Sequence, residues 1–143
     1  MTKRHILMAD PHGLAEFMKP ALAKLNPNLE LLSVADGARC ITAHAKLCNA
    51  KVPPLVTVIP DEIDLVSGRK VAITLRTVER KLGVPATAII YLQSESGDAD
   101  ESKQWGRAVS ITRGPIDQPK REAMRLIKAI AKVLSQLTGR GRK

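Results

Sequence analysis

Three short aliphatic runs of this chain end in polar side chains or proline. The runs and the residues that follow them are Ile6–Ala9 with Asp10, Leu55–Ile59 with Pro60 and Asp61, and Ala88–Leu92 with Gln93 and Ser94. Aliphatic runs of this length are typical of strands buried in a parallel sheet, and such proteins do their chemistry at the carboxyl ends of the strands. Two carboxylates that meet there could hold a magnesium ion, because Mg²⁺ is bound through one or two carboxylate groups.

The elements that must position these residues alternate along the chain between strand and helix. We expect strands at 6–9, 29–34, 55–59, 86–92 and 108–112 and helices at 14–25, 38–47, 69–82 and 119–137, with a further short helix containing Trp105. Apolar residues recur at helical spacing in the longer segments, and glycine or proline separates the segments. This order predicts an α/β fold with a single five-stranded parallel sheet flanked by five helices, doubly wound. We assign residues 1–137 to this domain and residues 138–143 to a flexible basic tail.

Composition excludes several other classes of protein. The chain has 143 residues, 44% of them hydrophobic, which fits one domain with a real core. Aromatic residues make up only 2%, too few for the stacking platforms of single-strand nucleic-acid binders. No apolar stretch approaches the roughly 18 residues of a membrane span, and the amino terminus lacks a secretory cleavage site, so we expect a cytoplasmic protein. Two cysteines give no disulfide framework.

Four stretches carry a resemblance to a known family. They are Pro53-Pro54-Leu55-Val56, the loop that ends at Gly68, the helix through Leu75-Arg76, and Gly106-Arg107-Ala108 before the last strand. Together with the order of elements, they make most of the chain, from about residue 5 to 137, similar to the receiver domain of bacterial response regulators, which is flavodoxin-like. The resemblance implies an aspartate at the end of the third strand that accepts a phosphoryl group. It also implies paired acids for Mg²⁺ after the first strand, a Thr or Ser after the fourth, and a Lys before the proline that follows the fifth.

The chain departs from that pattern at each of these positions. Pro11 follows Asp10 and brings no ligand atom. Leu92 and Gln93 fall nearest the Thr or Ser position, with Ser94 just beyond. Gly114 stands at the Lys position, with Arg113 one residue away. Counting back from Gly68 puts Pro60 at the phosphoacceptor position, and Asp61 takes it only if the loop is one residue shorter. Phosphoryl transfer needs cations to neutralise the developing charge. We therefore interpret these positions as a vestigial phosphorylation site, without catalytic residues, metal or other cofactor: Asp10, Pro60, Asp61, Gln93 and Gly114. Asp10 and Asp61 are interpreted as solvated loop acids.

Positive charge is concentrated in the last helix and the tail. The formal net charge is +9, and residues 113–143 hold nine basic side chains against two acids. Arg121, Arg125, Lys128 and Lys132 fall on one stripe at i, i+4, i+7 and i+11, opposite an apolar face. Such a stripe is either a solvated face or a docking strip. As the ligand of a docking strip we expect an acidic protein first and a nucleic acid second. Trp105 is either packed at the domain boundary or an anchor for that partner.

A third group, Cys40, His44 and Cys48, recurs every four residues on the second helix. Zinc takes about four ligands, and three along one helix face leave the fourth unassigned. Because free cysteines are commonly buried, we interpret this group as core.

The sequence therefore favours a non-enzymatic pseudo-receiver, a bacterial signalling module that acts by protein–protein contact and without phosphorylation. One alternative is a phosphorylatable single-domain response regulator that uses Asp61. Another is a small basic nucleic-acid-binding protein that uses the last helix and the tail.

Overall fold

The fold is seen in a computed structural model that describes residues 4–10, 13–61, 66–93, 105–112 and 118–141. Within those residues it has five strands and four helices. In chain order they are β1 (Arg4–Ala9), α1 (Ala15–Leu25), β2 (Leu29–Val34), α2 (Gly37–Asn49), β3 (Val56–Pro60), α3 (Gly68–Leu82), β4 (Ala88–Gln93), β5 (Ala108–Thr112) and α4 (Pro119–Gly141).

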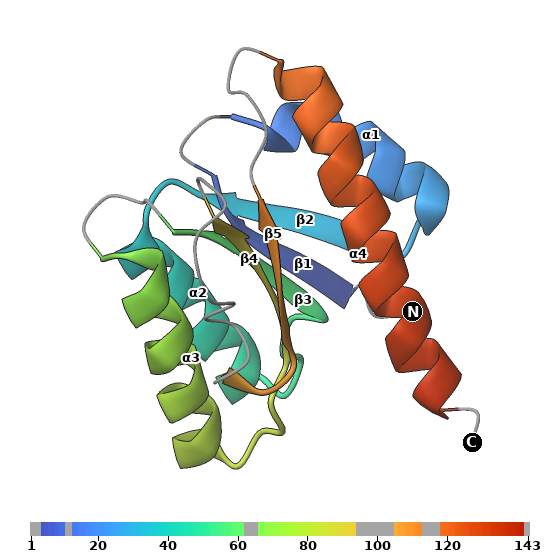
Figure 1. The fold of residues 1–143 in the computed structure, drawn as a ribbon. Helices are drawn as coiled ribbons and strands as arrows, with labels where there is room; N and C mark the ends of the chain where they lie inside the picture. Colours follow the sequence, from blue (N-terminus) through green and yellow to red (C-terminus); the bar gives the residue numbers. More distant parts are fainter. Residues whose placement is uncertain (1–3, 11–12, 62–65, 94–104, 113–117, 142–143) are drawn as a thin grey trace.

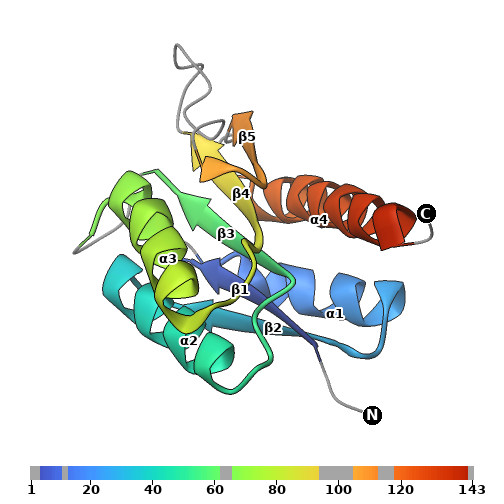
Figure 2. The same cartoon turned by 90° about the horizontal axis from the view of Figure 1, so that it is seen from below.

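The strands form one parallel sheet in the order β2-β1-β3-β4-β5. This is the order of doubly wound, flavodoxin-like sheets. Helices α1 and α4 cover one face of the sheet, and α2 and α3 cover the other (Figures 1 and 2). The predicted five-stranded parallel sheet is confirmed.

The central strands are mainly apolar because both of their faces are covered. In β1, Ile6 and Met8 pack toward α1 and α4, whereas Leu7 and Ala9 pack toward α2 and α3. These four side chains are at most 1% exposed. The sheet therefore separates two cores, and polar side chains gather at the ends of its strands.

Local signals fix most of the helix ends. The Asp36 side chain accepts a hydrogen bond from the Arg39 amide at 2.8 Å and so caps α2. Helix α3 ends at Gly83, whose φ of 71° lies in the left-handed region that glycine adopts without strain.

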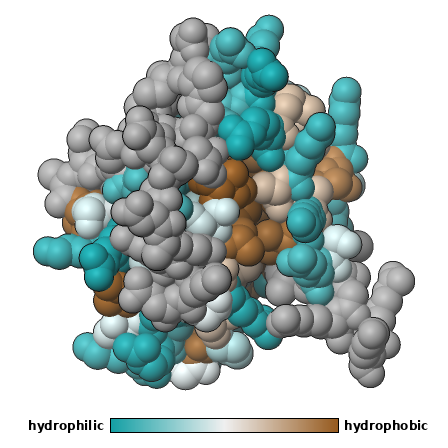
Figure 3. All heavy atoms as spheres, in the orientation of Figure 1, coloured by the Kyte–Doolittle hydropathy of each residue, from teal (hydrophilic) through white to brown (hydrophobic). Residues whose placement is uncertain are grey.

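Charged and polar side chains lie along the outer side of α4 (Figure 3). No described helix is long and apolar enough to cross a membrane.

One expectation about helices needs correction and another is tested only in part. The described residues contain four of the five expected helices, and the short helix expected after Asp100 falls mostly on residues 101–104, which lie outside the described residues. Helix α4 runs on to Gly141, past the predicted end at residue 137 and into the expected tail. Glycine in a helix costs only about 1 kcal/mol, so Gly139 does not by itself end this one.

Candidate functional site

Asp10 follows β1 and holds the start of α1. Its Oδ1 accepts a hydrogen bond from the Leu14 amide at 2.9 Å, and its Oδ2 accepts one from the Ala15 amide at 2.8 Å. A carboxylate at a helix amino terminus is stabilised both by these bonds and by the helix dipole. The expectation of a solvated loop acid is therefore wrong for Asp10, whose carboxylate is a structural cap with both oxygens already engaged.

Pro60 is the last residue of β3 and is buried. The β3–β4 pairing continues to Pro60 and Leu92, whereas the β1–β3 pairing ends earlier, at Met8 and Val58. Amides of successive strand residues point to opposite neighbours. Since the Asp61 amide donates to the Leu92 carbonyl on β4 at 2.8 Å, an amide at position 60 would face β1, where proline has none to give. Pro60 is thus compatible with the end of the backbone pairing on the β1 side of the strand.

Asp61 is half-buried and begins the loop to α3. Its carbonyl accepts a hydrogen bond from the Gly68 amide at 3.2 Å. A Cβ at Gly68 would stand 2.1 Å from the Pro60 carbonyl oxygen, so only glycine allows this close approach. The first residue of α3 is therefore held closely against the end of β3.

The remaining positions of the vestigial site are only partly described. Gln93 ends β4, and its Oε1 accepts a hydrogen bond from the Ser110 hydroxyl of β5 at 2.5 Å. Gly114 and its neighbour Arg113 lie outside the described residues. The side chain at position 93 is thus an amide held by the adjacent strand.

The described donor set at this rim is poor for a magnesium ion. Each Asp10 oxygen already accepts one amide hydrogen bond, Pro60 offers no side-chain ligand, and Gln93 accepts a hydrogen bond from Ser110, so Asp61 is the other carboxylate at this end of the sheet. Within the described part of the chain, no three His, Cys, Asp or Glu side chains are grouped so as to hold a metal.

A buried polar network between α2 and α3 is the feature that sequence reasoning missed. Glu79 of α3 is 2% exposed and lies at the centre of the network. Its Oε2 is 2.9 Å from His44 Nε2 and accepts the Thr87 hydroxyl at 2.6 Å, while its Oε1 accepts Arg76 Nη1 at 2.8 Å. Burial alone would raise the pKa of Glu79, but the hydrogen bonds from His44, Thr87 and Arg76 and the charge of Arg76 outweigh it and lower the pKa.

Arg76 extends this network to the residues that precede β5. Its Nε donates to the Trp105 carbonyl at 2.6 Å, and its Nη2 donates to the Arg107 carbonyl at 3.3 Å. The guanidinium therefore links α3 to the entrance of the edge strand. A helical wheel carries the signal for this role, since Ala72, Leu75, Arg76 and Glu79 fall on one stripe at i, i+3, i+4 and i+7.

Cys40, His44 and Cys48 are all buried, as the core interpretation requires. His44 pairs with Glu79, and the Cys48 sulfur lies 3.7 Å from His44 Nε2. Burial and, secondarily, the charge of Asp36 raise the pKa of the Cys40 thiol to about 12. Burial and the charge of Glu79 raise that of Cys48 to about 11. Thiols with these pKa values are protonated at neutral pH and react slowly as nucleophiles.

The α4 stripe is exposed, but its members differ. Arg121, Arg125, Lys128 and Lys132 all lie on the solvent side, whereas Ala123, Leu126, Ile127 and Ile130 are buried toward the sheet and α1. Arg125 Nη1 donates to Glu122 Oε1 at 2.8 Å, so part of its charge is neutralised. Lys128 and Lys132 form no ion pair within the described residues, which makes them the main candidates for contact with a partner.

Trp105 belongs to the core rather than to that surface. It is 5% exposed, and its ring meets Tyr91 edge-on with centroids 4.9 Å apart. A side chain this buried presents little to a partner, so of the two alternatives for Trp105 the structure favours packing over an anchor.

The arrangement of sheet and helices is that of a receiver domain. No family model and no curated protein matches the chain. Among solved structures, the response regulator receiver domain protein from Clostridium thermocellum is similar with a TM-score of 0.64 and 16% identity, over 95% of this chain and 97% of that one. The phosphorylated cyanobacterial phytochrome response regulator RcpA is similar with a TM-score of 0.64 and 18% sequence identity, over 91% of both chains. A third similar structure is the receiver domain of the histidine kinase CKI1 from Arabidopsis thaliana, complexed with Mg²⁺ and BeF₃⁻. Its TM-score is 0.60 and its sequence identity 17%, over 88% of this chain and 90% of that one. At these identities the likeness establishes the fold.

Proposed function

We propose that this chain is a receiver-fold signalling module that works by protein–protein contact, without phosphorylation and without enzymatic activity. The observation that carries the proposal is the engagement of Asp10, whose two oxygens cap α1. Each oxygen accepts one amide hydrogen bond, so a metal drawn to either oxygen would compete with one bond of the cap at the start of that helix. Pro60 at the end of β3 and the bonded Gln93 support the same conclusion. A bacterial, cytoplasmic setting is part of this proposal.

The partner surface in this proposal is the exposed stripe of α4, and the partner is an acidic protein. Lys128 and Lys132 supply exposed cations, and Arg121 extends the stripe toward the start of the helix. Exposed charges of this kind steer association and select the sign of the partner's surface more than they add affinity. The buried face of α4 holds the stripe in place against the sheet.

Loss of phosphorylation can be tested with small phosphodonors and a phosphoryl mimic. We expect no mass increase with acetyl phosphate and Mg²⁺, and no magnesium-dependent change in amide NMR spectra with beryllofluoride. The CKI1 receiver domain, whose structure contains Mg²⁺ and BeF₃⁻, is the positive control. A magnesium-dependent adduct that disappears in Asp61→Asn would overturn this part of the proposal and favour the phosphorylatable alternative.

The α4 surface can be tested by charge reversal. Lys128→Glu/Lys132→Glu should reduce recovery of a co-purifying partner, because the variant inverts the exposed charge without touching the core. Arg69→Glu/Lys70→Glu, in the exposed first turn of α3, changes the net charge equally and serves as the control. Equal recovery with both variants would exclude the stripe. Submicromolar duplex DNA binding with a steep salt dependence would instead support the nucleic-acid alternative.

A further inference from the structure

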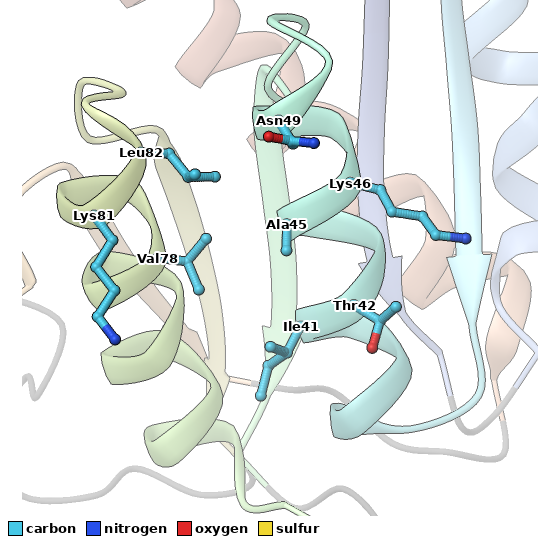
Figure 4. A pocket seen from close by; sticks show the side chains of 8 residues that line it. All are labelled: Ile41, Thr42, Ala45, Lys46, Asn49, Val78, Lys81 and Leu82. Carbon is cyan, nitrogen blue, oxygen red and sulfur yellow. The ribbon is translucent and has the colours of Figure 1, made fainter.

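A groove runs between α2 and α3, on the face of the molecule away from α4. It has a volume of about 530 Å³ and is lined by residues of the two helices: Ile41, Thr42, Ala45, Lys46, Asn49, Val78, Lys81 and Leu82. Val78 and Leu82 point from α3 toward α2, and Ala45 and Ile41 line the opposite wall (Figure 4). Leu82 is 40% exposed, so apolar surface in this groove is open to solvent.

The charges around the groove have one sign. Helix α2 contains no acid, and the single acid of α3 is Glu79, which is buried in the polar network. Lys46 and Lys81 stand on the two rims, and neither forms an ion pair within the described residues. The groove therefore combines an aliphatic floor with cationic edges.

The groove is also held open by the core beneath it. The His44–Glu79 contact joins α2 to α3 at 2.9 Å with both side chains at most 2% exposed. These two residues neighbour Ala45 and Val78, which line the groove. Because the spacing of the two helices is fixed by this contact, a ligand meets a preformed surface, which lowers the conformational cost of binding.

We infer that this groove docks an acidic amphipathic helix of a partner protein. Ile41 and Asn49 are eight residues apart on α2, about 12 Å along the axis, which accommodates about two turns of a helix with apolar anchors at i, i+4 and i+7. Glutamates that flank those anchors would meet Lys46 and Lys81. A second copy of this chain would bring a net charge of +9 against the same cations, and a nucleic acid would leave the aliphatic floor unmatched. The inference concerns a surface separate from the α4 stripe, so the two proposals can fail independently.

The probe is a fluorescein-labelled helical peptide with leucines at i, i+4 and i+7 and glutamates elsewhere, followed by fluorescence anisotropy. A peptide of the same composition with scrambled leucines keeps the charge and removes the apolar face. We expect the scrambled peptide to bind at least about tenfold more weakly, because its leucines no longer share a face. Equal binding of both peptides, or no binding of either up to millimolar concentration, would overturn the inference.

Variants locate the site. Two variants should each lower the affinity for the amphipathic peptide by about tenfold or more. They are the double variant Lys46→Glu/Lys81→Glu and the groove-filling Ala45→Arg. Lys128→Glu/Lys132→Glu on α4 lowers the net charge as much as the first variant and should leave binding within about twofold. Unchanged thermal unfolding shows that each variant is folded. Loss of binding in the α4 variant but not in the groove variants would refute the assignment, as would full displacement of the peptide by duplex DNA.

Discussion

Removing the charge of Glu79 should be among the most destabilising single changes in this protein. Its carboxylate contacts His44, Arg76 and Thr87 through four hydrogen bonds of 2.6 to 3.3 Å. Glu79→Gln keeps the size of the side chain but leaves the Arg76 guanidinium, whose side chain is 10% exposed, without its carboxylate. Breaking a buried pair in this way costs about 3–5 kcal/mol, a large share of the roughly 5–15 kcal/mol that stabilises a domain.

The measurement is urea unfolding followed by fluorescence of the single tryptophan, which is buried against Tyr91. The chain supplies a matched control, because His5 and Glu30 form a similar contact at 3.2 Å with the Glu30 side chain 47% exposed. Glu30→Gln should cost about 1 kcal/mol or less. Equal costs for the two substitutions would refute the reasoning that burial makes the inner pair decisive. In a double-mutant cycle, Arg76→Gln should couple to Glu79→Gln by about 1–3 kcal/mol.

Acid should weaken the same network. The pKa of Glu79 is lowered in the folded protein, so in acid the unfolded chain binds this proton more readily than the native state does. The stabilisation is therefore complete above the unfolded pKa of about 4.3 and is lost as the pH falls through the lower folded pKa. Urea midpoints measured between pH 6 and 3 should fall more steeply for the wild type than for Glu79→Gln. Parallel curves would contradict the assignment.

Three further outcomes are expected. Asp10→Ala should destabilise the protein by about 1 kcal/mol through loss of the α1 cap, seen as a lower urea midpoint; no change would remove Asp10 from its structural role. Gly68→Ala should lower the free energy of unfolding by about 1–3 kcal/mol or more, because the added Cβ would meet the Pro60 carbonyl oxygen. The control is Gly13→Ala at an exposed position where φ is positive but the space is open, so that it reports backbone strain without crowding. Cys40 and Cys48 should react with Ellman's reagent at pH 8 far more slowly in the native protein than in urea, since burial raises both thiol pKa values; rapid native labelling would show that these thiols are accessible.

The backbone of this protein was largely predictable from its pattern of apolar runs. Each predicted strand overlaps an observed one with ends shifted by at most two residues, because a strand covered on both faces must be continuously apolar. The exposed stripe of α4 was predictable for the same kind of reason, since Leu126 and Ile130 identify the buried face.

The polar contacts were less predictable because they join distant parts of the chain. His44 and Glu79 are 35 positions apart, and nothing local to either residue reveals the other. Charged residues on an apolar stripe of α3 were the available signal, and the hydrophobic pattern around them concealed it. For Asp10 the sequence predicts the position of the carboxylate at the end of β1 but not its orientation. Its hydrogen bonds show that it faces the Leu14 and Ala15 amides rather than solvent.

The contacts of Arg76 have a mechanical consequence. Its guanidinium donates from α3 to the carbonyls of Trp105 and Arg107, which precede β5, so a displacement of α3 has to break these bonds or carry the start of the edge strand with it. The His44–Glu79 contact extends the same constraint to α2.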